Sequence, residues 1–223
     1  MLFALLLCLS PALNPPPLKG HINDYAGLLE APAQERLEKL LTAYEARVGH
    51  QFAVLIVPSL EGDPLEDFSI RVADAWKLGS KKSDNGLLLL IAPHEHQARI
   101  EVGRGLEGVI PDAVAAQVIR QILKPAFRQQ DFAGGIEAAL KVLMQAGAGE
   151  KVELPNNQAQ QPLGIPLWLI ILLFLLAPPF MRWFGLGMLL GGGFRGGGGF
   201  GGGGGGFSGG GGGFSGGGAS GSW

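Results

Sequence analysis

The sequence has almost no cysteine and no excess of basic charge. Its single cysteine, Cys8, lies in an apolar segment near the N-terminus, so no disulfide or cysteine-based metal site can form within the rest of the chain. Lys and Arg number 17 against 19 Asp and Glu, and the formal net charge of -2 gives no positive field of the kind that nucleic-acid-binding domains carry. Nucleic acid is therefore not an expected partner.

An apolar segment at the start of the chain predicts export. Residues 1–13 resemble the hydrophobic region of a signal peptide and carry small residues near their end, although the basic residues that usually precede such a region are missing. Lipidation of Cys8 is one alternative, but Leu7 stands where a small residue is needed. An uncleaved membrane anchor is the other, and the apolar run is short for a bilayer.

A second segment with very little charge predicts a transmembrane helix at residues 163–184. Its apolar run is about long enough to cross a bilayer, and Trp168 and Trp183 stand where interfacial aromatic residues are found. Arg182 and Arg195 follow the run, so the positive-inside rule predicts a single-pass protein with a cytoplasmic tail and a periplasmic or extracellular domain. A buried helix of a soluble protein is the alternative. The membrane lipid bilayer is therefore an expected partner.

Glycine dominates the end of the chain. Residues 191–223 are mostly glycine with scattered Phe and Ser and a terminal Trp, so they are expected to be a disordered tail because they cannot bury enough apolar surface to fold. Weak association through the repeated GGGF, GGF and FSGG units is the alternative. Residues 149–162 are polar and predict a linker, which leaves residues 21–148 for one globular domain.

The globular segment has the pattern of an α/β domain. Residues 51–57 and 87–92 are apolar runs of strand length, and residues 99–102 alternate polar and apolar, as a half-buried strand does. A helical crossover between the first two predicts a parallel pair, and a short turn makes the third strand an antiparallel neighbour. Apolar residues at helical spacing predict helices that begin near Pro32, Pro64, Pro111 and Asp131. The expected fold is a sandwich with helices on both faces of a small mixed sheet.

Polar residues gather at one end of the predicted hairpin. Asp84 and Asn85 precede its first strand and Glu107 follows its second, so these residues share one edge of the sheet. Asp24, ahead of the first helix, is expected at the same edge. Carboxylates, an amide oxygen and loop carbonyls are ligands that hard cations prefer, and the sequence therefore predicts a calcium or magnesium site here.

Two other motifs were weighed against this site. Residues 103–108 match Gly-x-Gly-x-x-Gly, but the dinucleotide fingerprint requires glycines that open a helix within a parallel unit, so we interpret them as a tight loop. A second candidate metal site is the triplet His94, Glu95 and His96, although polar residues at a turn need no function. No Ser/His/Asp or Cys/His constellation is visible.

Five motifs in order resemble the TPM domain family over about residues 21–144. They are NDxAGLL from Asn23, WxLG from Trp76, DNGLLL from Asp84, RIEVGxGLEG from Arg99 and DFxxGI from Asp131. The resemblance implies a three-layer α/β/α sandwich. The order of signal peptide, domain, membrane span and Gly-rich tail also resembles that of bacterial members of the family.

The resemblance implies a function as well as a fold. Some TPM members bind calcium, and thylakoid-lumen members linked to photosystem II repair are reported as acid phosphatases. By matching position, Asp84, Asn85 and Glu107 are the expected metal ligands, with Asp24 and Asp131 as further candidates.

The first hypothesis is thus a membrane-anchored, extracytoplasmic, calcium-binding module that binds or assembles a membrane or extracytoplasmic protein partner. The alternative is a metal-assisted phosphatase in which Arg99 or Arg104 clamps a phosphoryl oxygen. A third hypothesis is that the tail carries the function and the domain is a spacer.

Overall fold

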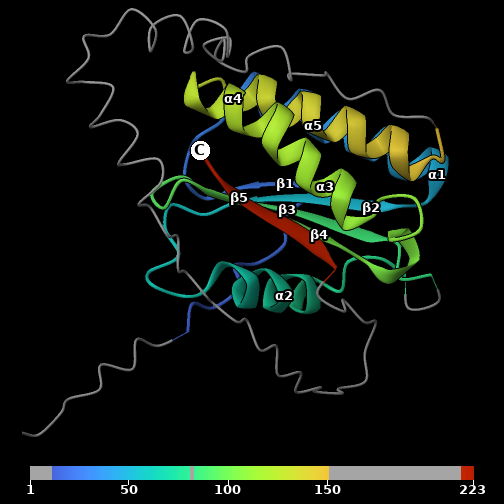
Figure 1. Cartoon of the computed structure of the whole chain (residues 1–223), viewed down its shortest axis with the longest axis horizontal. Coiled ribbons are helices and arrows are strands. Elements are labelled where there is room, and N and C mark those ends of the chain that lie inside the picture. Colours follow the sequence, from blue (N-terminus) through green and yellow to red (C-terminus); the bar gives the residue numbers. More distant parts are fainter. Residues whose placement is uncertain (1–11, 81–82, 151–216) are drawn as a thin grey trace, which may run out of the picture. The chain divides into compact units, whose positions relative to one another are not determined.

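A five-stranded mixed sheet forms the centre of the computed structural model, which describes residues 12–80, 83–150 and 217–223. The strands lie in the order β1 to β5, with β1–β2 and β2–β3 parallel and β3–β4 and β4–β5 antiparallel (Figure 1). Their bounds are β1 Ile22–Asp24, β2 Gln51–Ile56, β3 Gly86–Ala92, β4 Gln97–Val102 and β5 Gly218–Ser222. The predicted pairings of the three central strands are confirmed.

Helices cover both faces of this sheet, which confirms the predicted mixed α/β fold. Figure 1 shows α1 and α3 to α5 on one face and α2 alone on the other. The helix bounds are α1 Ala31–Val48, α2 Leu65–Trp76, α3 Asp112–Val118, α4 Lys124–Arg128 and α5 Phe132–Gly147. A 3₁₀ turn, η1 (Arg104–Leu106), follows β4, and a π-helical segment, η2 (Ile119–Leu123), joins α3 to α4.

The alternation of side chains divides the core between the two faces. On one face Val54, Leu89 and Ile100 pack with the apolar residues of α1, α3 and α5. On the other face Leu55, Leu88 and Leu90 pack with the apolar residues of α2, which are Leu65, Phe68, Val72, Ala73 and Trp76. Each such buried side chain stabilises the fold by about 1.5–3 kcal/mol. All of β3 is buried, as its uninterrupted apolar run predicted.

Pro125 lies within the helical path that begins with α3, and the structure shows how the helix continues past it. The backbone N–H of Lys124 donates to the carbonyl of Ile119, a π-type bond. Proline has no N–H to donate, and a π-helical turn changes the hydrogen-bonding register immediately before it. The helical path therefore runs from α3 through η2 into α4.

Strand β1 is a difference from the sequence analysis, which predicted no strand before residue 51. Ile22 pairs with Val54 and Asp24 with Ile56, so β1 extends the sheet beyond β2. Three residues are too few to show a period of two, and for this reason the sequence pattern could not predict the strand.

The polar face of β4 is buried, where the sequence predicted a half-exposed strand. Arg99 is 6% exposed and Glu101 is 0% exposed, because α2 covers this face of the sheet. Arg99 Nε lies 2.6 Å from Glu101 Oε2 and 2.9 Å from Ser69 Oγ. Glu101 Oε1 has no hydrogen-bond partner. Burial raises the pKa of Glu101, although the Arg99 charge opposes this effect.

This ion pair makes a prediction about stability. Arg99→Met should lower the free energy of unfolding by about 3–5 kcal/mol, because it leaves the Glu101 carboxylate buried without its counter-charge. Arg99→Met combined with Glu101→Leu should recover most of that loss. Arg36→Met, at an exposed position on α1, is the control and should change the free energy by less than about 0.5 kcal/mol. Urea unfolding followed by tryptophan fluorescence measures the free energy of unfolding of all three variants. Equal values for Arg99→Met and Arg36→Met would contradict the prediction.

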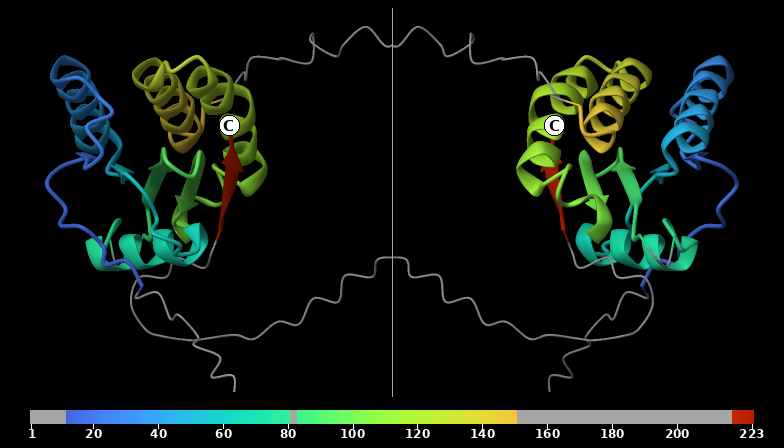
Figure 2. Two further views of the ribbon diagram at one scale, coloured as in Figure 1. Left: turned by 90° about the vertical axis from the view of Figure 1, so that its left-hand side faces the viewer. Right: turned by 90° about the vertical axis from the view of Figure 1, so that its right-hand side faces the viewer.

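Strand β5 corrects the expectation that residues 191–223 are disordered throughout. Residues 218–222 pair with all of β4 except its last residue, whose N–H donates to the carbonyl of Gly217 over 3.0 Å. Figure 2 shows the strand beside β4 at the edge of the sheet. Small residues can add a strand by main-chain hydrogen bonds alone, so a low apolar content does not prevent the pairing.

Several other expectations lie outside the described residues. They are the signal peptide over 1–11, most of the linker, the transmembrane helix at 163–184 and the tail over 191–216. Within the described ranges, no helix is both long and apolar enough to cross a membrane. While β5 is paired, both ends of segment 151–216 lie on one side of any bilayer. If a chain crosses the bilayer once and its tail is cytoplasmic, its β5 therefore cannot pair with its own β4.

Candidate functional site

The loop before β3 and the loop after β4 meet, as predicted. The N–H of Gly105 donates to the carbonyl of Asp84 over 3.1 Å, and the N–H of Gly103 donates to the carbonyl of Gly86 over 2.8 Å. Asp84, Asn85 and Glu107 therefore lie on adjoining loops at one end of the sheet. Asp84 has a φ of 43°, a left-handed conformation that aspartate tolerates better than most residues.

The side chain of Asn85 has a structural task in this loop. Its Oδ1 accepts the N–H of Ser80 over 2.9 Å, and its Nδ2 donates to the carbonyl of Gly49 over 2.7 Å. The first bond closes the loop before β3, and the second joins that loop to the end of α1. Asn85 Oδ1, which was predicted to be a metal ligand, thus already accepts a hydrogen bond within its own loop.

Asp24 and Asp131 do not join this group, and the expectation for Asp24 was wrong. In the parallel register Asp24 lies opposite Ile56, at the far end of the sheet from Gly86. The reason is that Asp24 ends β1 whereas Asp84 precedes β3, and parallel strands begin at the same end. The Asp24 carboxylate accepts the N–H groups of Ala26 and Leu29 over 2.9 and 2.8 Å.

Asp131 is the N-cap of α5, as the sequence predicted, and accepts the N–H of Gly134 over 2.9 Å. The start of α5 lies beside Trp223, which contacts the β3–β4 turn, while its other end lies beside Phe52 near the start of β2. Asp131 is therefore also at the far end from Asp84. Among the residues that the structure describes, no three His, Cys, Asp or Glu side chains are grouped so that they could share a metal ion.

The Gly-x-Gly-x-x-Gly motif is the tight loop that we inferred. A Cβ at Gly105 would lie 1.7 Å from the carbonyl oxygen of Ser83, and one at Gly103 would lie 2.2 Å from that of Asp84. The third glycine, Gly108, faces open space. The first two glycines therefore let two backbones touch, and the 3₁₀ turn η1 occupies the place where a dinucleotide fold would begin its helix.

These glycines can be tested against each other. Gly105→Ala should destabilise the fold by about 1–3 kcal/mol, since the loops must separate to admit a methyl group. Gly108→Ala in the same motif should change stability by less than about 0.5 kcal/mol. Thermal unfolding of the two variants measures the difference, and equal melting temperatures would show that the loop contact is not required.

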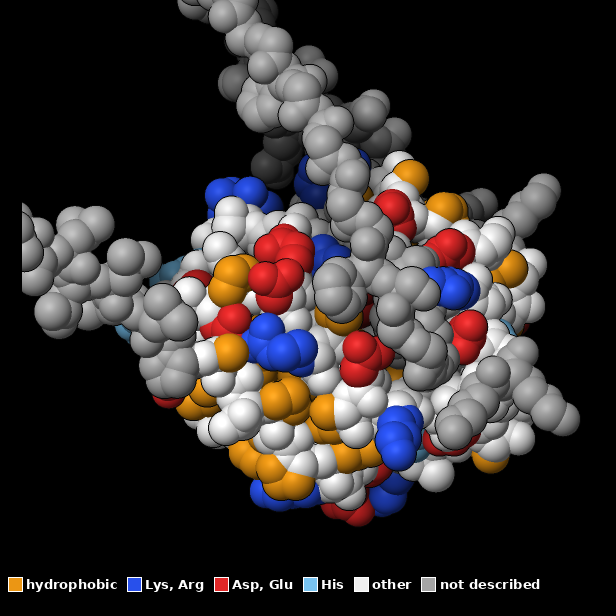
Figure 3. All heavy atoms as spheres, turned by 90° about the horizontal axis from the view of Figure 1, so that it is seen from below, with side chains coloured by type: hydrophobic (Ala, Val, Ile, Leu, Met, Phe, Trp, Pro, Cys, Tyr) orange, Lys and Arg blue, Asp and Glu red, His pale blue; other side chains and the backbone are white. Residues whose placement is uncertain are grey.

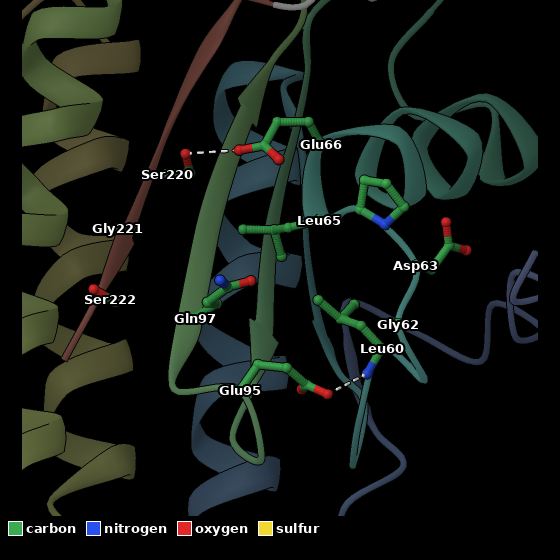
Figure 4. Close-up of a pocket in the computed structure, with 11 residues that line it drawn as sticks. Leu60, Gly62, Asp63, Leu65, Glu66, Glu95, Gln97, Ser220, Gly221 and Ser222 are labelled. Carbon is green, nitrogen blue, oxygen red and sulfur yellow. Dashed lines mark hydrogen bonds between the residues drawn. The ribbon is translucent and has the colours of Figure 1, made fainter. Parts of the chain in front are cut away.

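A separate pocket lies along β5, away from the predicted metal edge. It has a volume of about 510 Å³. Its walls are the loop before α2, the β3–β4 turn and the outer strand, as Figure 4 shows. The lining residues are Leu60, Gly62, Asp63, Pro64, Leu65, Glu66, Glu95, Gln97, Ser220, Gly221 and Ser222.

The acidic groups of this pocket are held by neighbours. Glu66 Oε1 accepts the hydroxyl of Ser220 over 2.9 Å, and this bond lowers the pKa of Glu66 (Figure 4). Glu95 Oε1 accepts the hydroxyl of Ser59 and the N–H of Leu60 over 2.6 and 3.0 Å. Burial opposes ionisation of Glu95, but these bonds hold its pKa below the usual value. Asp63 forms an ion pair with Arg71.

Within the His94-Glu95-His96 triplet, His94 Nδ1 lies 3.5 Å from Glu95 Oε1, whereas the ring of His96 lies 5.7 Å from that of Trp223. Glu95 lines the pocket, and the side chain of His94 is 79% exposed. Arg99 is also unable to clamp a phosphate, because it is buried in its pair with Glu101. Arg104 is exposed at the Asp84 end of the sheet.

The outer edge of β4 forms what we call the tail seat, together with Asp112, Ile119, Phe127 and Phe132. The ring of Trp223 lies 4.7 Å from that of Phe127 and 6.3 Å from that of Phe132. Asp112 Oδ1 accepts the N–H of Gly218 over 2.8 Å, and Ala219 is buried. The sequence analysis missed this site. Its only signal was a Trp directly after five small residues at the end of a glycine tail.

The tail seat admits only glycine at two positions of the strand. A Cβ at position 218 would lie 2.2 Å from the carbonyl oxygen of Ile100, and Gly218 has a φ of 150°. A Cβ at position 221 would lie 2.6 Å from Cγ2 of Ile119. The tail seat therefore selects glycine at its first and fourth positions and an aromatic residue after the fifth.

Charged side chains of both signs lie on one face of the described residues. On the face seen in Figure 3, Lys and Arg side chains are mixed with Asp and Glu side chains.

Together these features define a small α/β sandwich domain with polar loops at one end and a strand-binding edge. The profile of the TPM domain matches residues 22–146, which is more than half of the chain, and the chain therefore belongs to the TPM domain family. Comparison with curated proteins gives no match.

Two solved structures are similar to this chain. The solution structure of the N-terminal domain of a protein from P. gingivalis is 34% identical with a TM-score of 0.54, covering 57% of this chain and 82% of that one. The N-terminal domain of a protein from Corynebacterium glutamicum is 19% identical with a TM-score of 0.46, covering 66% and 92%.

Proposed function

We propose that this TPM domain is a binding module that holds an extended peptide segment along the outer edge of β4. The observation that carries the proposal is β5 itself. Residues 151–216 separate it from the rest of the domain, and it offers the sheet only Gly, Ala and Ser side chains. A short strand that arrives from a distant part of the chain and pairs through its main chain resembles a bound peptide in β-augmentation.

The chemistry of the tail seat supports selective binding. Main-chain hydrogen bonds along β4 supply affinity for any extended segment, whereas Ile100 and Ile119 leave no room for side chains at two positions. The ring of Trp223 packs against Phe127 and Phe132 of the neighbouring helices. The expected ligand is therefore a Gly-rich strand that ends in an aromatic residue.

The module works at a membrane under this proposal. The apolar run at 163–184 attaches it to the bilayer, and export by residues 1–13 places the domain outside the cytoplasm, next to a membrane or extracytoplasmic protein partner. With β5 seated, the end of the tail is on the domain's side of the bilayer.

Peptide binding tests the proposal. A fluorescent peptide with the sequence of residues 217–223 should bind saturably to the full chain carrying Trp223→Ala, because that substitution weakens the chain's own strand. The same peptide with Val in place of Gly221 should bind at least about tenfold more weakly, because the Val side chain would meet Ile119. Fluorescence anisotropy measures both, and equal binding of the two peptides would contradict the proposal.

Calcium binding at the Asp84 end is a further part of the proposal. Asp84 and Glu107 lie on adjoining loops that a backbone hydrogen bond joins, and loop carbonyls accompany them. Two carboxylates with carbonyl oxygens fit a hard cation, and bound calcium would neutralise their charge and fix the two loops together.

Calorimetric titration with calcium checks this site. Asp84→Asn and Glu107→Gln should each weaken binding by at least about tenfold, since each removes a charged ligand. Asp131→Asn should leave binding unchanged, because asparagine preserves the cap of α5 at the far end of the sheet. Binding that survives both edge substitutions would exclude the site. Phosphate-ester hydrolysis lost in these variants and in Arg104→Gln would instead favour the phosphatase hypothesis.

A further inference from the structure

The tail sequence contains three segments of the pattern that the tail seat holds, whereas the described part of the chain has one such seat. The seated segment consists of five small residues, Gly218–Ser222, followed by Trp223. The same spacing occurs in residues 202–206 followed by Phe207 and in residues 209–213 followed by Phe214. All three segments have glycine at the two positions where the seat has no room for a side chain. The three segments therefore compete for a single seat.

The segments differ in how well they fit. Residues 218–223 add the buried methyl group of Ala219, the bond from Ser220 to Glu66, and an indole ring between Phe127 and Phe132. The other two segments offer only glycine and a phenyl ring, so they should bind more weakly. The best-fitting segment is also the last, and it extends beyond the seat whenever an earlier segment occupies it.

We propose that the tail seat of one chain receives residues 218–223 of a second copy, so that copies are linked tail to domain. This inference rests on the function proposed above for the seat and names its partner. An earlier segment of a chain's own tail holds its own seat, and the released end then pairs with the β4 edge of a neighbour. Attachment to one membrane surface raises the local concentration of copies, which favours the exchange over pairing within a chain.

Little of the seated strand has to be rebuilt when it exchanges. β5 makes the same main-chain hydrogen bonds with any β4 edge, and residues 218–223 add one buried methyl group, one hydroxyl hydrogen bond and one aromatic ring. The strand also lies at the edge of the sheet, so its departure leaves the pairing of β1 to β4 in place.

Disulfide trapping in the full-length protein tests the proposal. Gln97 and Ser222 lie directly opposite each other in the register and both line the pocket of Figure 4. Their position between hydrogen-bonded pairs brings the two Cβ atoms close enough for a disulfide. Two differently tagged chains, each carrying Cys8→Ala, receive Gln97→Cys and Ser222→Cys respectively. They are co-expressed in one membrane, oxidised, and separated on a non-reducing gel.

A disulfide-linked heterodimer is expected from this pair. Replacing Gln97→Cys by Asp67→Cys, on the exposed side of α2, should reduce the heterodimer to background, and so should Gly221→Val in the donor chain. Phe207→Ala with Phe214→Ala in the donor should also reduce it, because the chain's own terminal segment then keeps its seat. A heterodimer that forms equally with Asp67→Cys would reflect collision and overturn the proposal.

A single chain with both Gln97→Cys and Ser222→Cys distinguishes a failure of exchange between copies from a failure of the tail seat. An intrachain disulfide without any heterodimer in the mixed experiment would leave the seat intact and overturn exchange between copies. The absence of both disulfides would overturn the seat itself, and with it the proposed function.

Discussion

The pairing of β4 along both of its edges is the constraint on which the structure depends. β3 satisfies the inner edge and β5 the outer one, and the same strand carries the buried Arg99–Glu101 pair beneath α2. Buried backbone groups without partners cost as much as a lost hydrogen bond. Because the two faces of β4 are covered by helices, its outer edge needs a strand that adds little bulk. A segment of Gly, Ala and Ser meets that requirement, whereas large side chains would collide with Ile100 and Ile119.

Much of the fold followed from the sequence, because its strong signals are local. The apolar run in β3, the proline starts of the helices and the short hairpin turn predicted the central strands and their directions. Strand β1 was missed because three residues show no period. The burial of Arg99 and Glu101 was missed because an alternating pattern does not reveal which face a helix will cover. Strand β5 was missed because its composition is that of a disordered tail, and only the long-range contacts of Trp223 distinguish it.

The candidate site was predicted unevenly for similar physical reasons. The loops that carry Asp84, Asn85 and Glu107 were correctly placed at one end of the sheet, since a hairpin fixes which loops share an end. Asp24 was misplaced because residues before a helix can lie at either end of a sheet until the strand that precedes them is known. The tail seat combines β4, Asp112, η2 and α4 with residues from the end of the chain, and no local pattern reports such a combination.

The position of β5 also changes what counts as the domain. The family match ends at residue 146, yet the sheet is completed by residues 218–222, so the folded unit is discontinuous in sequence. A fragment cut at the end of α5 would lack the strand that pairs with the outer edge of β4. Open edges of this kind recruit strands from other molecules and promote aggregation. The residues of β5 thus cover an edge that the family match leaves open.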